Sequence, residues 1–161
     1  MGRVVIVCGS PADDKHAQAI AVAAQDLGLS TIIRIASAHR TPEHALAVLR
    51  DVEAATEPTV LITVAGRSNA LSGFADPQVT VPVIACPPLS DQADIDIWSS
   101  LRMPAGVAPV VVLEPANAAL AAAKMLGLAD PSIRQRVAAA QAKARTRVLD
   151  ADAASTSAGA Q

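Results

Sequence analysis

Aromatic side chains are almost absent from this chain of 161 residues, which contains one Phe, one Trp and no Tyr. Single-stranded bases and flavin rings are usually held by stacking on aromatic side chains, so both kinds of ligand are disfavoured. Cysteine is equally scarce. Cys8 and Cys86 are too few for the disulfide framework of a small secreted domain.

Long hydrophobic runs and an excess of charge of one sign are also lacking. No stretch approaches the roughly 18 apolar residues of a membrane span, and the apolar run Val4 to Cys8 is too short for the core of a signal peptide. The formal net charge is -2, which disfavours a nucleic-acid coat. We therefore expect a cytoplasmic protein that has neither a membrane nor a nucleic acid as its partner.

The sequence does contain a hydrophobic fraction of 52%, which suffices for the core of one domain of this length. Short β-branched runs alternate with Ala-rich windows in which apolar residues recur at helical spacing. The predicted strands are 3–8, 31–35, 59–65, 81–85 and 110–113, and the predicted helices are 15–27, 42–55, 93–102, 115–126 and 131–149. We expect residues 1–150 to form the domain and residues 151–161 to be a disordered tail.

Strands that are apolar along their whole length, each followed by a helix, are typical of a parallel sheet covered on both faces. With right-handed crossovers, this pattern predicts the α/β class: a single three-layer αβα domain around a doubly wound parallel sheet, flavodoxin-like or Rossmann-like. Ligands of such sheets bind beyond the carboxyl ends of the strands. The segments that follow the strands are therefore the candidate site.

The first two of these segments carry residue types that suit a phosphorylated sugar. Ser10 and Ser37 have hydroxyl donors, and Arg40 offers a planar fork of N–H groups to a phosphate. Asp13 is able to accept hydrogen bonds from ribose hydroxyls. The alternative is that Ser10 and Asp13 only cap the helix that follows them.

Histidine titrates near neutral pH, and one of the three histidines lies in a candidate loop. His39 stands beside Ser37 and Arg40, in the place for a general acid or base, whereas His16 and His44 fall inside predicted helices and are expected to be structural. No second His or Cys lies near His39 at the spacing of metal ligands, so we predict no metal site. The two cysteines are expected to be buried and inert.

Three stretches of the chain resemble the PurE family of de novo purine synthesis. They are Gly9-Ser10-x-x-Asp13, the Ser-Ala-His-Arg-Thr-Pro of residues 37–42, and the Met-Pro-Ala-Gly of residues 103–106. The similarity runs from about residue 4 to residue 128. It implies an enzyme that makes 4-carboxy-5-aminoimidazole ribonucleotide without metal, ATP or biotin. It also implies a homo-octamer whose active sites are shared between subunits.

The family has two branches, which the segment after the third strand distinguishes. The class I mutase moves a carboxylate from the N5-carboxyamino form of the ribonucleotide to the ring carbon, and the class II carboxylase uses CO2 and aminoimidazole ribonucleotide directly. Mutases typically carry a histidine where this chain has Ala70, and Gly-Arg-Ser-Asn at residues 66–69 is similar to class II. Residues 85–88 and 96–102 are also similar to class II. Two departures are the mutase-like Arg40-Thr41 and Ala12, which replaces a usual serine.

The resemblance assigns roles to the candidate residues. It implies that His39 moves the proton at carbon 4 of the imidazole ring. The ribose phosphate is then held by four residues: Ser10, Asp13, Ser37 and Arg40. Gly66 and Ser68 line the pocket for the base and CO2, while Arg67 and Asn69 either shape that pocket or order its loop, with Ala70 and Leu71 as further possible wall residues.

Three alternatives remain open at this point. The first is the class I mutase. The second is the carboxylase domain of nickel-pincer cofactor synthesis, which normally carries an extra N-terminal region that this sequence lacks. The third is a nucleotide-binding module without catalysis, which would bind the ligand without exchanging CO2.

Overall fold

The computed structural model describes residues 2–88 and 93–158, and its centre is a parallel sheet. The sheet has five strands in the order β2-β1-β3-β4-β5. Their bounds are β1 Arg3–Cys8, β2 Ser30–Ile35, β3 Thr59–Val64, β4 Val83–Ala85 and β5 Val110–Val111. The α-helices are α1 Asp14–Asp26, α2 Pro42–Glu53, α3 Ala70–Ala75, α4 Ala93–Asp96, α5 Trp98–Leu101, α6 Pro115–Leu126 and α7 Pro131–Ala158. Two short 3-10 helices, η1 Pro11–Asp13 and η2 Asp76–Gln78, complete the described elements.

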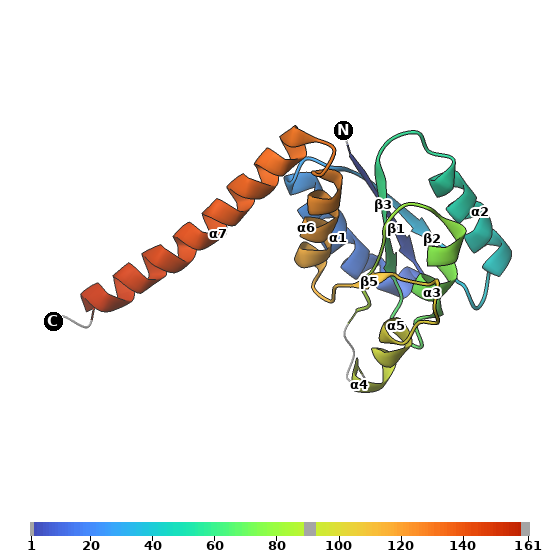
Figure 1. The fold of residues 1–161 in the computed structure, drawn as a ribbon. Coiled ribbons are helices and arrows are strands. Elements are labelled where there is room, and N and C mark those ends of the chain that lie inside the picture. Colours follow the sequence, from blue (N-terminus) through green and yellow to red (C-terminus); the bar gives the residue numbers. More distant parts are fainter. Residues whose placement is uncertain (1, 89–92, 159–161) are drawn as a thin grey trace.

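Helices cover both faces of the sheet, so the predicted three-layer αβα fold is confirmed (Figure 1). Alternate residues of β1 face opposite layers, as the two-residue period of a strand requires. Val4 and Ile6 pack with α1, α6 and the first turns of α7, whereas Val5 and Val7 pack with α2 and α3. All of β3 is buried, including Thr59 and Thr63, as expected for a central strand of a sheet that is covered on both faces.

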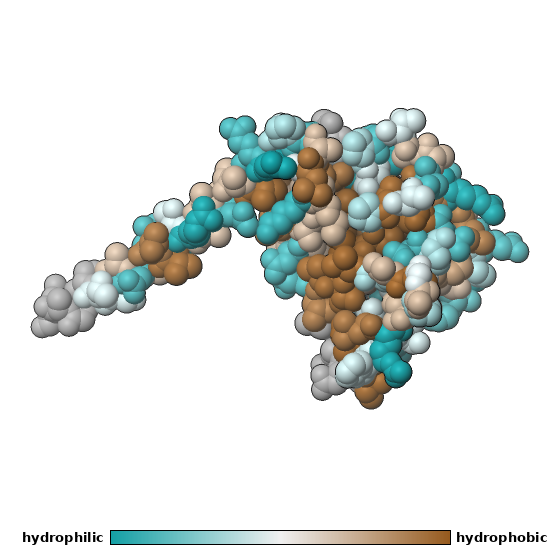
Figure 2. Space-filling model, viewed as in Figure 1, coloured by the Kyte–Doolittle hydropathy of each residue, from teal (hydrophilic) through white to brown (hydrophobic). Residues whose placement is uncertain are grey.

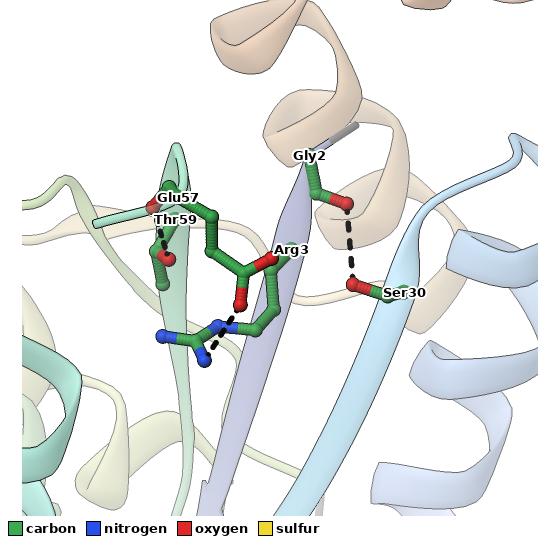
Figure 3. Close-up of polar contacts among 5 residues, drawn as sticks. All are labelled: Gly2, Arg3, Ser30, Glu57 and Thr59. Atoms are coloured by element: carbon green, nitrogen blue, oxygen red, sulfur yellow. Dashed lines mark hydrogen bonds and ion pairs between the residues drawn. The ribbon is translucent and has the colours of Figure 1, made fainter. Parts of the chain in front are cut away.

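Polar contacts join the amino ends of the three strands β1, β2 and β3 (Figure 3). Arg3 Nη1 lies 2.8 Å from Glu57 Oε1, and the Thr59 hydroxyl donates to the Glu57 carbonyl at 2.9 Å. On the other side of β1, the Ser30 hydroxyl donates to the Gly2 carbonyl at 3.4 Å. These contacts tie the amino ends of the three strands together, and the candidate loops lie at the opposite, carboxyl edge.

The last helix, α7, leaves the body of the molecule soon after it begins (Figure 1). Ile133 and Val137 are buried in the core, and nearly every described residue beyond them is exposed. The helix continues to Ala158, so the disorder expected from residue 151 is not found over residues 151–158. Alanine favours the helical state, and the Ser155 and Thr156 hydroxyls donate back to carbonyls of the preceding turn. Residues 159–161 of the expected tail lie outside the described part.

Other differences from the predicted elements concern short segments. The helix expected over 93–102 is two helices, α4 and α5, and β5 is shorter than expected. Helix α3 and η2 were not predicted. No helix in the described ranges combines the length and the apolar character needed to cross a membrane.

Candidate active site

Three loops at the carboxyl edge of the sheet enclose a pocket of about 570 Å³. They follow β1, β2 and β3, which are neighbours in the sheet, so their ends meet at one edge. All but one of the predicted site residues line this pocket: Ser10, Asp13, Ser37, His39, Arg40, Gly66, Arg67, Ser68, Ala70 and Leu71. The exception is Asn69.

The first loop, Gly9 to Asp13, begins beside the end of β3, where the Gly9 N–H donates to the Val64 carbonyl at 2.8 Å. A Cβ atom on Gly9 would lie 3.2 Å from that of Ala65, so a larger residue would push the two loops apart. The Ser10 hydroxyl accepts from the Ala12 N–H at 3.2 Å and thereby caps η1. Ser10 therefore caps a helix and also faces the pocket. Asp13, by contrast, makes no side-chain cap bond to α1.

Burial raises the pKa of the Asp13 carboxyl. The Ser10 hydrogen bond and the positive charges of His16 and Arg40 act in the opposite direction but only in part. A carboxylate that is held in a partly buried position at some cost in stability is typical of a functional group.

The second loop, Ser37 to Thr41, is a tight turn that its own polar groups hold together. The Arg40 N–H donates to the Ser37 hydroxyl at 3.2 Å, and the Ser37 N–H donates to the Thr41 hydroxyl at 3.0 Å. His39 lies at the tip of this turn, where its side chain is exposed and lines the pocket. The Arg40 guanidinium reaches the first loop and donates from Nη2 to the Gly9 carbonyl at 2.9 Å.

The third loop contains Gly66, Arg67 and Ser68, and it ends at Asn69. Asn69 is 1% exposed and points away from the pocket. Its Oδ1 accepts from the Ser72 N–H at 3.3 Å and caps α3, while its Nδ2 donates to the Ser100 hydroxyl at 2.9 Å. The possible place of Asn69 in the pocket lining is therefore not found, and of its two expected roles the structure supports the second, the ordering of the loop. The reason is that its amide caps α3 and pairs with a buried hydroxyl.

Comparison with known proteins identifies the family. A family model described as AIR carboxylase matches residues 3–147 of the chain. The chain belongs to the AIR carboxylase family. It is 48% identical over 151 residues to the phosphoribosylaminoimidazole carboxylase of Archaeoglobus fulgidus, covering 93% of this chain and 83% of the relative. It is 47% identical over 150 residues to the protein of the same name from Treponema denticola, covering 92% of this chain and 94% of the relative.

A solved structure of the same family has the same fold. The crystal structure of Treponema denticola PurE superimposes with a TM-score of 0.93 at 45% identity, covering 95% of this chain and 98% of that one. Like its named relatives in the AIR carboxylase family, the chain is an enzyme.

The remaining histidines and both cysteines of this family member lie outside the pocket lining. Cys8 and Cys86 are buried and unpaired, and burial raises the pKa of each thiol to about 12, as expected for inert thiols. His16 Nε2 lies 3.4 Å from Cys86 Sγ, and burial lowers the pKa of this imidazole. His44 is exposed on α2. Of the three imidazoles, only that of His39 lines the pocket.

Two residues that support the third loop were not expected from the sequence. Asp96 Oδ1 accepts from the Ser68 N–H at 3.2 Å, and Ser100 is the buried partner of Asn69. They lie 28 and 31 positions further along the chain. Within the residues that the structure describes, no three His, Cys, Asp or Glu side chains form a group that could hold a metal ion.

Proposed function

We propose that this member of the AIR carboxylase family is the class II enzyme, which joins CO2 directly to carbon 4 of 5-aminoimidazole ribonucleotide in de novo purine synthesis. The feature that carries the proposal is Ala70. It lines the pocket at the position where the resemblance places the histidine of the class I mutase. A methyl group has no exchangeable proton, so His39 supplies the one imidazole in the pocket lining, and we assign the proton transfer to it.

The first two loops supply the groups that we assign to the ribose phosphate. Ser10, Ser37 and Arg40 bring two hydroxyls and a guanidinium to one wall, and Asp13 is the acceptor for ribose hydroxyls. Arg40 uses one of its five N–H donors on the Gly9 carbonyl, which leaves other donors for a phosphate. Serine hydroxyls and one fixed guanidinium suit a phosphate monoester better than an extended dinucleotide.

The proposed reaction needs one bond to form and one proton to leave. Carbon 4 of the electron-rich aminoimidazole attacks the carbon of CO2, and one C=O electron pair moves to oxygen to give the carboxylate. Carbon 4 then carries both a hydrogen and the carboxylate. The His39 imidazole takes that hydrogen as a proton, and the C–H electron pair restores the aromatic ring. General base action of this kind accelerates a reaction by roughly 10²–10⁴-fold.

The third loop is assigned to CO2 and to the carboxylate that forms from it. The Ser68 N–H already donates to Asp96, so we assign the stabilising contacts to the Ser68 hydroxyl and the Gly66 N–H. The proposal involves no metal, ATP or biotin, because the enamine carbon is itself a nucleophile. The protein contributes orientation, exclusion of water and transfer of the proton.

A comparison of two substrates tests the proposed function. The purified enzyme is supplied with aminoimidazole ribonucleotide and bicarbonate, or with the N5-carboxyamino ribonucleotide, in both cases without ATP. We expect 4-carboxy-5-aminoimidazole ribonucleotide to form from the first mixture at a rate that rises with dissolved CO2. Formation only from the N5-carboxyamino compound would identify a mutase, and binding without product would identify a module that lacks catalysis.

We also infer a cytoplasmic homo-octamer with active sites shared between subunits. Hydrophobic side chains gather over β5 and between α5 and α6 (Figure 2), and Trp98, Leu101 and Val110 are 59%, 52% and 45% exposed. Such a patch on a protein surface is typical of an interface. The projecting part of α7 adds the exposed Val148 and Leu149, both 69% exposed. Two free buried thiols suit a reducing compartment.

A further inference from the structure

The third pocket loop adopts a backbone conformation that needs support. Ser68 has a φ of 43°, and within the described ranges it is the one residue other than glycine with a positive φ. Residues with a Cβ rarely take this left-handed conformation, which persists only where neighbouring contacts fix it. Ser68 also lines the pocket and is assigned to the carboxylate above. The left-handed conformation therefore occurs at a residue to which we assign a role in the reaction.

The contacts that fix this loop come from α4 and α5, on the side away from the pocket. Asp96 Oδ1 accepts from the Ser68 N–H at 3.2 Å. The next residue, Asn69, donates from Nδ2 to Ser100 at 2.9 Å, and Ser100, like Asn69, is 1% exposed. Two consecutive loop residues, Ser68 and Asn69, are therefore bound by two side chains of the segment that α4 and α5 form.

That segment is itself braced at the junction between its two short helices. The Ser99 hydroxyl donates to the Asp96 carbonyl at 2.7 Å, and the Ser100 N–H donates to the Ile97 carbonyl at 2.9 Å. These two bonds hold the backbone of the segment that carries both the Asp96 carboxylate and the buried Ser100 hydroxyl. The two acceptors hold the Ser68 N–H and the Asn69 side-chain amide, and so restrict the backbone on both sides of Ser68.

We propose that Asp96 is a positioning residue for the carboxylation reaction, acting by holding Ser68 in its left-handed conformation. This role rests on the proposed function in so far as the third loop binds CO2. Without the carboxylate, the Ser68 N–H loses its acceptor, and the residue is free to relax to a negative φ. That change rotates the peptide and moves the Ser68 hydroxyl away from the reacting carboxylate, while the phosphate groups of the first two loops stay in place.

Steady-state kinetics of three variants test this role. In Asp96→Ala we expect kcat to fall by about tenfold or more, because small displacements of orienting groups have effects of this size, with KM for the nucleotide within about twofold of wild type. Asp96→Asn keeps an oxygen acceptor and is expected to restore most of kcat. Asp76→Ala is the matched control: it removes a carboxylate that accepts the Ala108 N–H at 2.8 Å, outside the pocket lining. Its kcat is expected to be unchanged.

Amide hydrogen exchange gives a second measurement that needs no substrate. The Ser68 amide is expected to exchange faster in Asp96→Ala than in wild type, while the amides of β1 and β3 keep their rates. Wild-type kcat in Asp96→Ala, or an equal loss of kcat in Asp76→Ala, would overturn the positioning role. If wild type does not carboxylate the nucleotide, the proposed function fails. The exchange rate of Ser68 then decides alone whether Asp96 fixes the loop.

Discussion

Arg40 donates from Nη2 to the carbonyl oxygen of Gly9 at 2.9 Å and thereby joins the loop after β2 to the loop after β1. Both loops contribute to the wall that we assign to the phosphate, so one side chain sets the distance between them and also faces the ligand. A guanidinium is suited to this double use because its donors are held in one rigid plane. A substitution of Arg40 is therefore expected to change both the binding of the phosphate and the shape of the pocket.

Replacement of Arg40 is expected to weaken nucleotide binding more than turnover. Arg40→Ala removes a charged donor to the phosphate, and hydrogen bonds to charged groups contribute about 1.5–3 kcal/mol, which corresponds to a rise in KM of roughly 10- to 100-fold. Arg40→Lys keeps the charge without the fork and should be intermediate. Initial-rate kinetics with varied nucleotide measure both. An unchanged KM in Arg40→Ala would refute the phosphate assignment.

Asp13 is expected to make the fold less stable at neutral pH than a neutral side chain would. Burial raises the pKa of this carboxyl, so the folded protein holds the proton more tightly than the unfolded chain does. Stability then falls as pH rises from the unfolded pKa through the folded one, and the loss is complete once the pH exceeds the folded pKa. Asp13→Asn should therefore melt at a higher temperature than wild type at neutral pH, and the gap should close towards about pH 4. Thermal unfolding across this range is the measurement, and a gap that does not vary with pH would contradict the burial argument.

Asn69 is expected to contribute stability without touching the ligand. Asn69→Ala leaves the buried Ser100 hydroxyl and the Ser72 N–H without their partner, a loss of about 1–3 kcal/mol in the free energy of unfolding. Urea denaturation measures this loss. Asn117→Ala, on the exposed side of α6, is the matched control and should stay within about 0.5 kcal/mol of wild type. Equal stability of the two variants would show that the Asn69 bonds do not support the loop.

The projecting part of α7 is expected to serve assembly rather than the fold of the subunit. A chain that ends after Gln141 keeps Ile133 and Val137, the α7 residues in the core, so it should still unfold cooperatively, and its circular dichroism spectrum should lose only the helical signal of the residues removed. Sedimentation should show a smaller assembly than for the full chain. Ile133→Ala, in contrast, should lower the free energy of unfolding by about 2–5 kcal/mol. An assembly with the same number of subunits after truncation would contradict the role of α7 in assembly.

Sequence patterns predicted the elements that pack on the sheet well, because these elements bury apolar surface, whereas the exposed part of α7 extends beyond its expected end. Strand β1, helix α6 and the end of α1, which Gly28 with its φ of 74° follows closely, agree with the expectation to within a residue. Helix α3 was missed because it is short and contains Gly73, and because its first turn depends on the Asn69 cap and on packing against distant residues.

The pocket could be predicted because parallel strands bring their carboxyl ends to one edge, so loops far apart in the sequence meet there. His39, Arg40 and Ser68 were all found in this way. Asp96 could not be found, because a hydrogen bond from its side chain to a backbone N–H 28 positions away leaves no periodic signal. The sequence likewise could not show that the Asn69 side chain points into the protein interior and away from the pocket.

The most direct test of the account is the substitution His39→Asn, because His39 is the imidazole assigned to move the proton at carbon 4. Asparagine can form hydrogen bonds but does not titrate near neutral pH. Calorimetry should show aminoimidazole ribonucleotide bound to the variant with an affinity close to that of wild type, while kcat for carboxylation falls by roughly 10²–10⁴-fold. A variant that binds the nucleotide and turns it over at close to the wild-type rate would contradict the central role of His39.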